Sequence, residues 1–120
     1  MWRNRYDFST SRLQKDVYKR QPVLDKERVS EIRKVVSVPL VLHGASGLSD
    51  DDVKECVQRG MCKVNFATEL RVAYTDAGKK LLKEKPDTFD PKKLGVVGME
   101  AVKELVMGRM KVCGCDHKAD

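Results

Sequence analysis

The chain has 120 residues, of which 41% are hydrophobic and 35% are charged, with a formal net charge of +6. That length suits one modest domain, and no apolar run approaches the roughly 18 residues that cross a membrane, so we expect a cytoplasmic protein with no membrane partner. The basic opening lacks the apolar stretch and small-residue cleavage site of a secretory signal. The cysteines, Cys56, Cys62, Cys113 and Cys115, form no obvious disulfide framework.

Residues 1–21 hold most of the net positive charge. They carry a net +4, which leaves +2 for residues 22–120. A polar, charge-rich stretch without apolar periodicity is most often disordered, so we expect a disordered or non-native leader that belongs to no assigned domain. A nucleic-acid-binding arm is the alternative interpretation. No platform of interleaved aromatic and basic residues supports it elsewhere, so we expect no nucleic-acid partner.

From Pro22 onward the sequence becomes regular. Apolar residues recur at near-helical spacing with charges between them, which predicts a surface helix with an apolar stripe of Leu24, Val29, Ile32 and Val35. Pro39 then opens a continuous apolar run over residues 40–42. Such a run predicts a short strand that is buried on both faces, as in a parallel sheet covered by helices.

This apolar run ends abruptly in His43, and Gly44 and Gly47 then bracket Ser46. A strand that delivers an imidazole to a loop of phosphate size has the layout of an active-site edge. His43 is therefore a candidate metal ligand or catalytic group. Two simpler interpretations stay open, because a lone strand-end histidine is more often a core or loop residue and both glycines could serve only the turn.

A second strand and two more helices follow the glycine loop. Ser49, followed by three aspartates, predicts a capped helix over residues 49–59 that Gly60 ends. Residues 61–67 then predict a strand, and a longer helix is expected from Thr68 to about residue 85. With connections this short, the order strand, helix, strand, helix makes the two strands parallel neighbours in one sheet.

Two motifs in this order carry a family resemblance. They are residues 38–47, VPLVLHGASG, and residues 63–71, KVNFATELR. Together they resemble the C-terminal part of class II, zinc-dependent ketose-bisphosphate aldolases, most closely the tagatose- and fructose-bisphosphate branch. The resemblance covers about residues 22–115, including the turn at 90–93 and a final helix that ends at Cys113-Gly114-Cys115.

The resemblance implies an α/β fold, the (β/α)8 TIM barrel, of which residues 22–120 would be the C-terminal portion. They would supply strands 7 and 8 with their helices and a C-terminal helical extension. The loops after these two strands are the common phosphate site of such barrels. By the same resemblance, His43 would be a zinc ligand. The phosphate of dihydroxyacetone phosphate would be held by Gly44, Ala45 and Ser46 on one side and by Asn65, Phe66, Ala67 and Thr68 on the other.

Physical chemistry favours this placement of the anion. The amides near Thr68 lie at a helix N-terminus, where negative charge is stabilised. Asp50, Asp51 and Asp52 would instead repel a phosphate from the preceding helix. Other interpretations stay open. Asn65 could only cap the barrel rim, and Arg71 could contact a phosphate rather than solvent. The spacing of Cys113, Cys115 and His117 matches no common zinc site, so we expect an exposed tail there rather than a metal site.

The resemblance also limits the chemistry that we expect of this chain. Full-length relatives reversibly cleave fructose or tagatose 1,6-bisphosphate to dihydroxyacetone phosphate and glyceraldehyde 3-phosphate. They use zinc, sometimes with a monovalent cation, and are usually homo-oligomers. Their catalytic Asp, in a His-x-Asp-His motif, and their other zinc-ligand histidine belong to upstream segments that this sequence lacks; its second histidine is His117.

We therefore expect a fragment of a class II aldolase that contains no catalytic residue and has no aldolase activity by itself. With unpaired strand edges, it should be only marginally stable. Two alternatives remain. One is a non-catalytic barrel remnant that binds phosphate, and the other is a basic-tailed module that binds nucleic acid.

Overall fold

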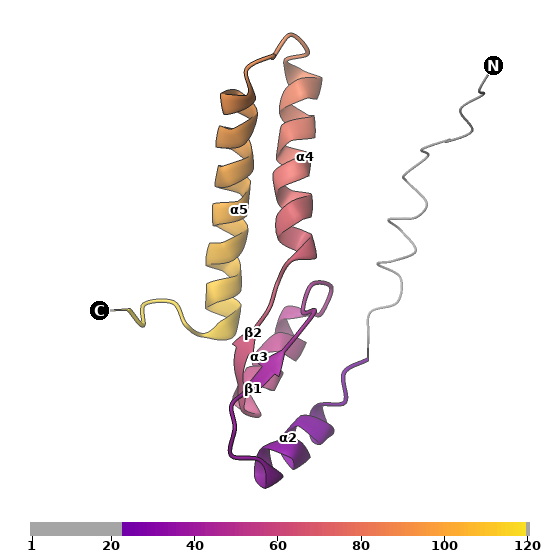
Figure 1. The fold of residues 1–120 in the computed structure, drawn as a ribbon, viewed down its shortest axis with the longest axis vertical. Helices are drawn as coiled ribbons and strands as arrows, with labels where there is room; N and C mark the ends of the chain where they lie inside the picture. The colour runs from indigo at the N-terminus through magenta and orange to yellow at the C-terminus, as the bar shows by residue number, and fades with distance from the viewer. Residues whose placement is uncertain (1–22, 120) are drawn as a thin grey trace, which may run out of the picture.

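The computed structural model describes residues 23–119, so the predicted leader lies outside the described residues. The elements along the chain are α2 (Lys26–Val35), β1 (Leu40–Leu42), α3 (Asp50–Gln58), β2 (Met61–Val64), α4 (Thr68–Glu84) and α5 (Pro91–Cys113). The first four gather at one end of the molecule. Helices α4 and α5 form a long hairpin that projects from them, and α5 returns to the strands at its C-terminal end (Figure 1).

The two strands pair in parallel, as the order of elements predicts, with Leu42 opposite Val64. Hydrogen bonding continues one residue further, because the N–H of Asn65 donates to the carbonyl of Leu42 at 2.9 Å. Ala67 then has φ −136° and ψ −56°, which turns the chain into α4. Strand β2 therefore ends at Val64, earlier than the predicted end at residue 67.

Only one face of β1 is buried. Leu42 is 6% exposed and packs with Val53 and Cys56 of α3, whereas Val41 is 39% exposed. The prediction of a strand buried on both faces is wrong for this chain, because the described residues cover the Leu42 side and leave the Val41 side open.

The core lies between β1, β2, α3 and the C-terminal end of α5. Its buried members are Leu42, Ala45, Leu48, Val53 and Cys56. Val112 and Cys113 pack against it from α5. Cys113 is therefore the half-buried last residue of a helix, which corrects its prediction as part of an exposed tail.

The predicted helix ends are largely confirmed. Ser49 Oγ accepts a hydrogen bond from the Asp52 N–H at 3.1 Å and so caps α3. Gly60, with φ +111°, follows the end of that helix. The Asp90 side chain caps α5, and Gly114 ends it in the left-handed conformation at φ +70°.

The projecting hairpin makes the described part elongated. Its radius of gyration is 18.9 Å, whereas a compact chain of similar size would have about 13 Å. Within residues 23–119, no helix is both long and apolar enough to span a membrane.

Helix α2 is joined to α3 through charged side chains. Val29 is buried, but Val35 at the end of the predicted apolar stripe is 82% exposed, so the helix is confirmed and its full stripe is not. Lys26 Nζ lies 3.0 Å from Asp52 Oδ1 and 2.6 Å from Glu55 Oε2. One lysine thus joins two carboxylates of α3 to α2.

Acid should weaken this docking. Hydrogen bonds from Lys26 and then Arg59 lower the pKa of Glu55 below its ordinary value. Because the folded-state pKa lies below the unfolded one, the stability from these contacts is present above about pH 4.3 and is lost as the pH falls through the folded pKa. We expect Glu55→Gln to flatten the acid limb of a plot of unfolding free energy against pH, measured by urea denaturation. Glu31→Gln, at an exposed position on α2, should leave that limb steep. Equal slopes in the two variants would contradict the expectation.

Candidate functional site

The structure brings the two sequence motifs into direct contact. Because β1 and β2 are parallel, their carboxyl ends meet at one edge, and the loops that follow them lie together. The N–H of Ala45 donates to the carbonyl of Asn65 at 3.1 Å. This hydrogen bond links the loop after β1 to the segment before α4, as expected for two halves of one site.

His43 follows β1 directly and is exposed at this edge. Its Nδ1 lies 2.8 Å from the side-chain Nδ2 of Asn65. If the amide nitrogen of Asn65 donates this hydrogen bond, the ring hydrogen of His43 sits on Nε2. If the amide is turned so that its oxygen accepts from the Nδ1–H of His43, then Nε2 has a free lone pair for a metal or a proton. Asn65 thus contacts the histidine.

The glycine loop is shaped by positive φ angles. Gly44 has φ +65° and Gly47 has φ +93°, and a Cβ at either residue would meet nothing within 4 Å. Glycine is therefore required there for backbone conformation and not for lack of space. The N–H groups of Gly44, Ser46 and Gly47 make no hydrogen bond within the described part of the chain. They are the donors that this loop can offer to an anion.

The backbone of Ala45 links the glycine loop to the segment before α4. It is fully buried, and its N–H is already used by the Asn65 carbonyl, so it joins the two segments and offers no donor to a ligand. The neighbouring Ser46 faces the start of α4, where its Oγ accepts weakly from the N–H of Glu69 at 3.5 Å. The hydroxyl hydrogen of Ser46 is left to donate elsewhere.

The N-terminus of α4 has no side-chain cap. Ala67 occupies the cap position and makes no side-chain hydrogen bond. The N–H of Glu69 donates weakly to Ser46, and the amides of Ala67 and Thr68 make no hydrogen bond within the described part of the chain, so they are open to an external acceptor. Ala67 and Thr68 are both exposed. The glycine loop and the first turn of α4 together form a concentration of N–H groups suited to phosphate.

Negative charge near these donors is neutralised by a residue that sequence reasoning missed. Arg109, on α5, binds both carboxylate oxygens of Glu69, one at 2.8 Å from Nε, and contacts Asp50 Oδ1 at 2.6 Å. Glu69 belongs to the first turn of α4 and Asp50 to that of α3. These hydrogen bonds, above all those with Glu69, raise the pKa of Arg109. The sequence carried one signal for Arg109, because it is the single charged residue inside the apolar run at residues 105–110.

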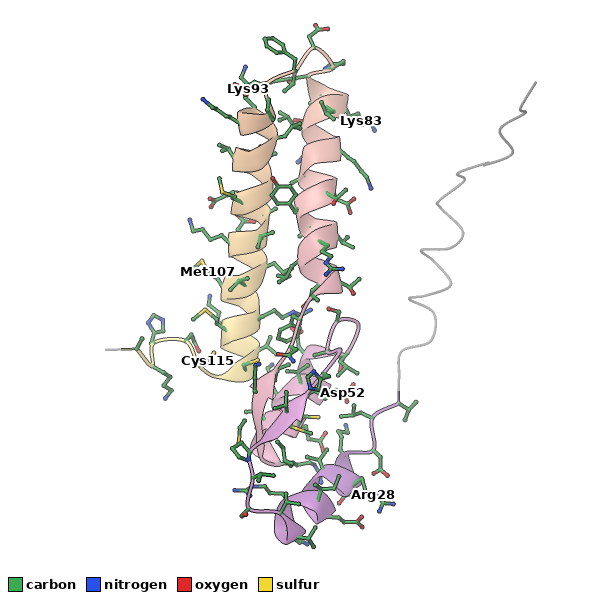
Figure 2. All side chains as sticks on the ribbon, viewed as in Figure 1. Arg28, Asp52, Lys83, Lys93, Met107 and Cys115 are labelled. Carbon is green, nitrogen blue, oxygen red and sulfur yellow. The ribbon has the colours of Figure 1, made fainter. Side chains whose placement is uncertain are left out.

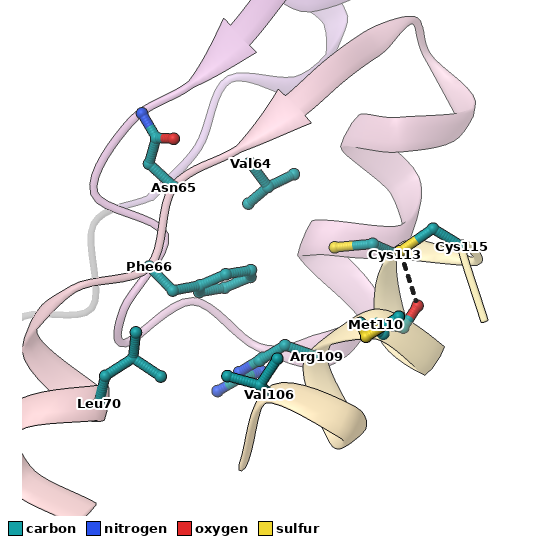
Figure 3. Close-up of a pocket in the computed structure, with 9 residues that line it drawn as sticks. All are labelled: Val64, Asn65, Phe66, Leu70, Val106, Arg109, Met110, Cys113 and Cys115. Atoms are coloured by element: carbon teal, nitrogen blue, oxygen red, sulfur yellow. Dashed lines mark hydrogen bonds between the residues drawn. The ribbon is translucent and has the colours of Figure 1, made fainter. Parts of the chain in front are cut away.

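Phe66 points away from the donors. Its ring lies under Arg109, whose Cζ is 5.1 Å from the ring centroid, in a cation–π contact. Both residues line a mainly apolar cavity of about 440 Å³ beside β2. Figure 3 shows the Phe66 ring and Arg109 together on one side and the Asn65 amide on the other. Any contribution of Phe66 to a cradle is thus made by its backbone.

The remaining candidates lie outside this edge. Arg71 is exposed on α4. Cys115 Sγ donates to the carbonyl of Met110 at 3.4 Å (Figure 3), and His117 is exposed with φ +53°. Within residues 23–119, no three His, Cys, Asp or Glu side chains lie close enough together to hold a metal ion. A complete zinc centre, which takes three protein ligands, therefore does not fit the described residues, and His43 could supply one ligand.

The comparisons with known proteins agree with the motifs. The sequence matches the family described as fructose-bisphosphate aldolase class-II over residues 15–118, a match that begins ahead of the boundary expected at Pro22. The fold is similar to the crystal structure of the YdjI aldolase from Escherichia coli K12, with a TM-score of 0.72 and 42% sequence identity. The match covers 82% of this chain and 37% of that one, so the chain spans little more than a third of the solved relative.

Proposed function

We propose a role in ketose-bisphosphate cleavage for this chain, which belongs to the class-II fructose-bisphosphate aldolase family. Its part is to hold the phosphate of the substrate and to supply one metal ligand. The observation that carries the proposal is the hydrogen bond between Ala45 and Asn65, together with the 2.8 Å contact between Asn65 and His43. These contacts join the two motifs at one edge, where the histidine and the free amides lie.

The phosphate would lie between the glycine loop and the first turn of α4. Gly44 and Ser46 would donate from one side, and Ala67 and Thr68 from the other, where the helix dipole also favours an anion. Arg109 supports this by neutralising Asp50 and Glu69, whose charges would otherwise repel the ligand. Ala45 and Phe66 hold the two segments in place, through the hydrogen bond of one and the packed ring of the other.

His43 would be one zinc ligand, and the other ligands and the acid–base residue would come from parts of a longer enzyme. In that enzyme β1 and β2 would be strands 7 and 8 of a (β/α)8 barrel. The substrate would be fructose or tagatose 1,6-bisphosphate, and the complete protein would be a cytoplasmic homo-oligomer that also accepts a monovalent cation. The present chain alone is expected to cleave neither sugar.

The test uses a chimera in which residues 22–115 replace the equivalent segment of a full-length class-II fructose-bisphosphate aldolase. His43→Ala should lower both the bound zinc and kcat, the latter by at least about a hundredfold, because even residues that only support a ligand cost 10- to 100-fold. Ser46→Ala should raise KM about tenfold and leave the zinc content unchanged, because it removes one hydrogen bond to a charged group.

Ser37→Ala, at an exposed residue before β1, is the matched control and should change neither quantity. Steady-state cleavage of fructose and tagatose bisphosphates and metal analysis give the readouts. The proposal fails if a folded His43→Ala chimera keeps its zinc and its rate, or if Ser46→Ala and Ser37→Ala behave alike.

A further inference from the structure

Three sulfur-bearing side chains gather at the C-terminal end of α5. Met110 and Cys113 lie three residues apart in this helix, so they share one of its faces. Cys115 follows two residues after the last residue of the helix, and all three line the mainly apolar cavity of about 440 Å³ beside β2. Figure 3 shows them together at the helix end, and Figure 2 labels Cys115 where α5 returns to the strands.

The turn that ends α5 folds Cys115 back onto the helix. Gly114 adopts φ +70°, and its N–H donates to the carbonyl of Lys111 at 3.0 Å. The N–H of Cys115 donates to the carbonyl of Met110, also at 3.0 Å, and the Cys115 Sγ donates to the same carbonyl at 3.4 Å. The backbone therefore holds the Cys115 thiol beside Met110, on the cavity that the Cys113 thiol also lines, before any ligand binds.

The environment of the two thiols favours a metal over redox or nucleophilic chemistry. Burial and then the neighbouring Cys115 raise the pKa of Cys113, and Arg109 opposes this shift by a smaller amount. Arg109 is the one other titratable side chain among the described residues that line the cavity. A thiol with a raised pKa is a poor nucleophile, whereas a bound metal ion displaces the thiol protons.

The donor set favours a soft monovalent ion. Thiolate and thioether sulfur are the ligands that select Cu(I), and the described residues that line this cavity include no carboxylate or imidazole for a harder ion. Two cysteines do not complete a zinc site, which takes at least three strong protein ligands. Val64, Phe66 and Val106 line the same cavity, and their apolar side chains limit the access of water to an ion held there.

We propose that Met110, Cys113 and Cys115 bind one Cu(I) ion at this end of α5. On binding, the two S–H bonds break, two S–Cu bonds form and two protons pass to solvent, while the copper stays Cu(I). The Sδ of Met110 supplies a neutral third ligand. The site is separate from the strand edge that carries His43, and the inference does not depend on the proposed aldolase function.

The test is an anaerobic titration of the reduced full chain with Cu(I), in competition with the chromophoric chelator bathocuproine disulfonate. The wild type should take up one Cu(I) per chain and show the ultraviolet absorption of copper–thiolate bonds. The logarithm of its affinity should rise with pH with a slope of about two, because two protons leave. Cys115→Ser should weaken binding at least about a hundredfold and reduce that slope to about one, and Met110→Leu should weaken binding about tenfold, because a thioether carries no charge.

Cys62→Ser and His117→Ala are the matched controls. Cys62 is an exposed thiol like Cys115 but belongs to β2 and does not line the cavity, and His117 is exposed two residues beyond Cys115. Neither substitution should change the affinity. Since Cys115 is exposed, its serine variant should keep the helices, which circular dichroism verifies. A folded Cys115→Ser chain that binds Cu(I) as tightly as the wild type, or an equal loss of affinity in either control, would overturn the proposal.

Discussion

Replacing Arg109 by Met is expected to destabilise the chain by about 2–3 kcal/mol, because breaking a largely buried ion pair leaves its partner charge uncompensated. The side chains of Arg109 and Glu69 are only 19% and 16% exposed. The substitution also removes the contact with Asp50 and the cation–π contact with Phe66. Urea denaturation followed by circular dichroism would measure the loss.

A second substitution tests this cause. If the uncompensated carboxylate produces most of the loss, then Glu69→Leu combined with Arg109→Met should recover a large part of it, as expected for coupled residues. Arg71→Met, at an exposed position on α4, should change the free energy of unfolding by less than about 0.5 kcal/mol. An Arg109→Met chain as stable as Arg71→Met would show that the ion pair contributes nothing.

Two glycines of α5 should respond to alanine in opposite directions. A Cβ on Gly98 would lie 2.5 Å from Cε2 of Tyr74, whereas a Cβ on Gly108 would meet nothing within 4 Å. We expect Gly98→Ala to destabilise the hairpin by about 1–3 kcal/mol through overpacking. Gly108→Ala should stabilise the chain by up to about 1 kcal/mol, because alanine favours a helix more than glycine does. Urea denaturation midpoints of the two variants give the comparison.

Tyr74 makes this prediction specific. The ring of Tyr74 is what occupies the space at Gly98, so in a Tyr74→Ala background Gly98→Ala should be neutral or stabilising. A double-mutant cycle measures this coupling. If Gly98→Ala costs the same stability in both backgrounds, the α4–α5 contact does not depend on the tyrosine packing seen here.

Much of the local structure could be predicted because it depends on neighbours in the sequence. Ser49 caps its helix through a hydrogen bond to a residue three positions on, and Gly114 ends α5 through its own φ. The parallel pairing of β1 and β2 follows from a short connection that admits few topologies. The two motifs also implied that His43 and Asn65 would lie in one site, and they lie in contact.

Other features depend on residues far apart in the sequence. The open side of Val41 could not be read from its apolar run, because burial depends on what the rest of the fold brings over each face of the strand. Arg109 reaches Glu69 across 40 positions of sequence, and such a contact leaves no local periodicity. The sequence also did not determine to which side of the chain the Phe66 ring would point, because a residue just after a strand can point to either side.

The sequence by itself thus determined the family, the order of the elements and the residues that gather at one strand edge, because capping, periodicity and motif spacing are local properties. Only the tertiary structure decided which donors there remain free, that Ala45 uses its N–H to join the two loops, and that Arg109 neutralises the nearby acids. The physical reason is that hydrogen-bond donors and charges act on whatever lies within a few ångströms, and folding chooses those neighbours.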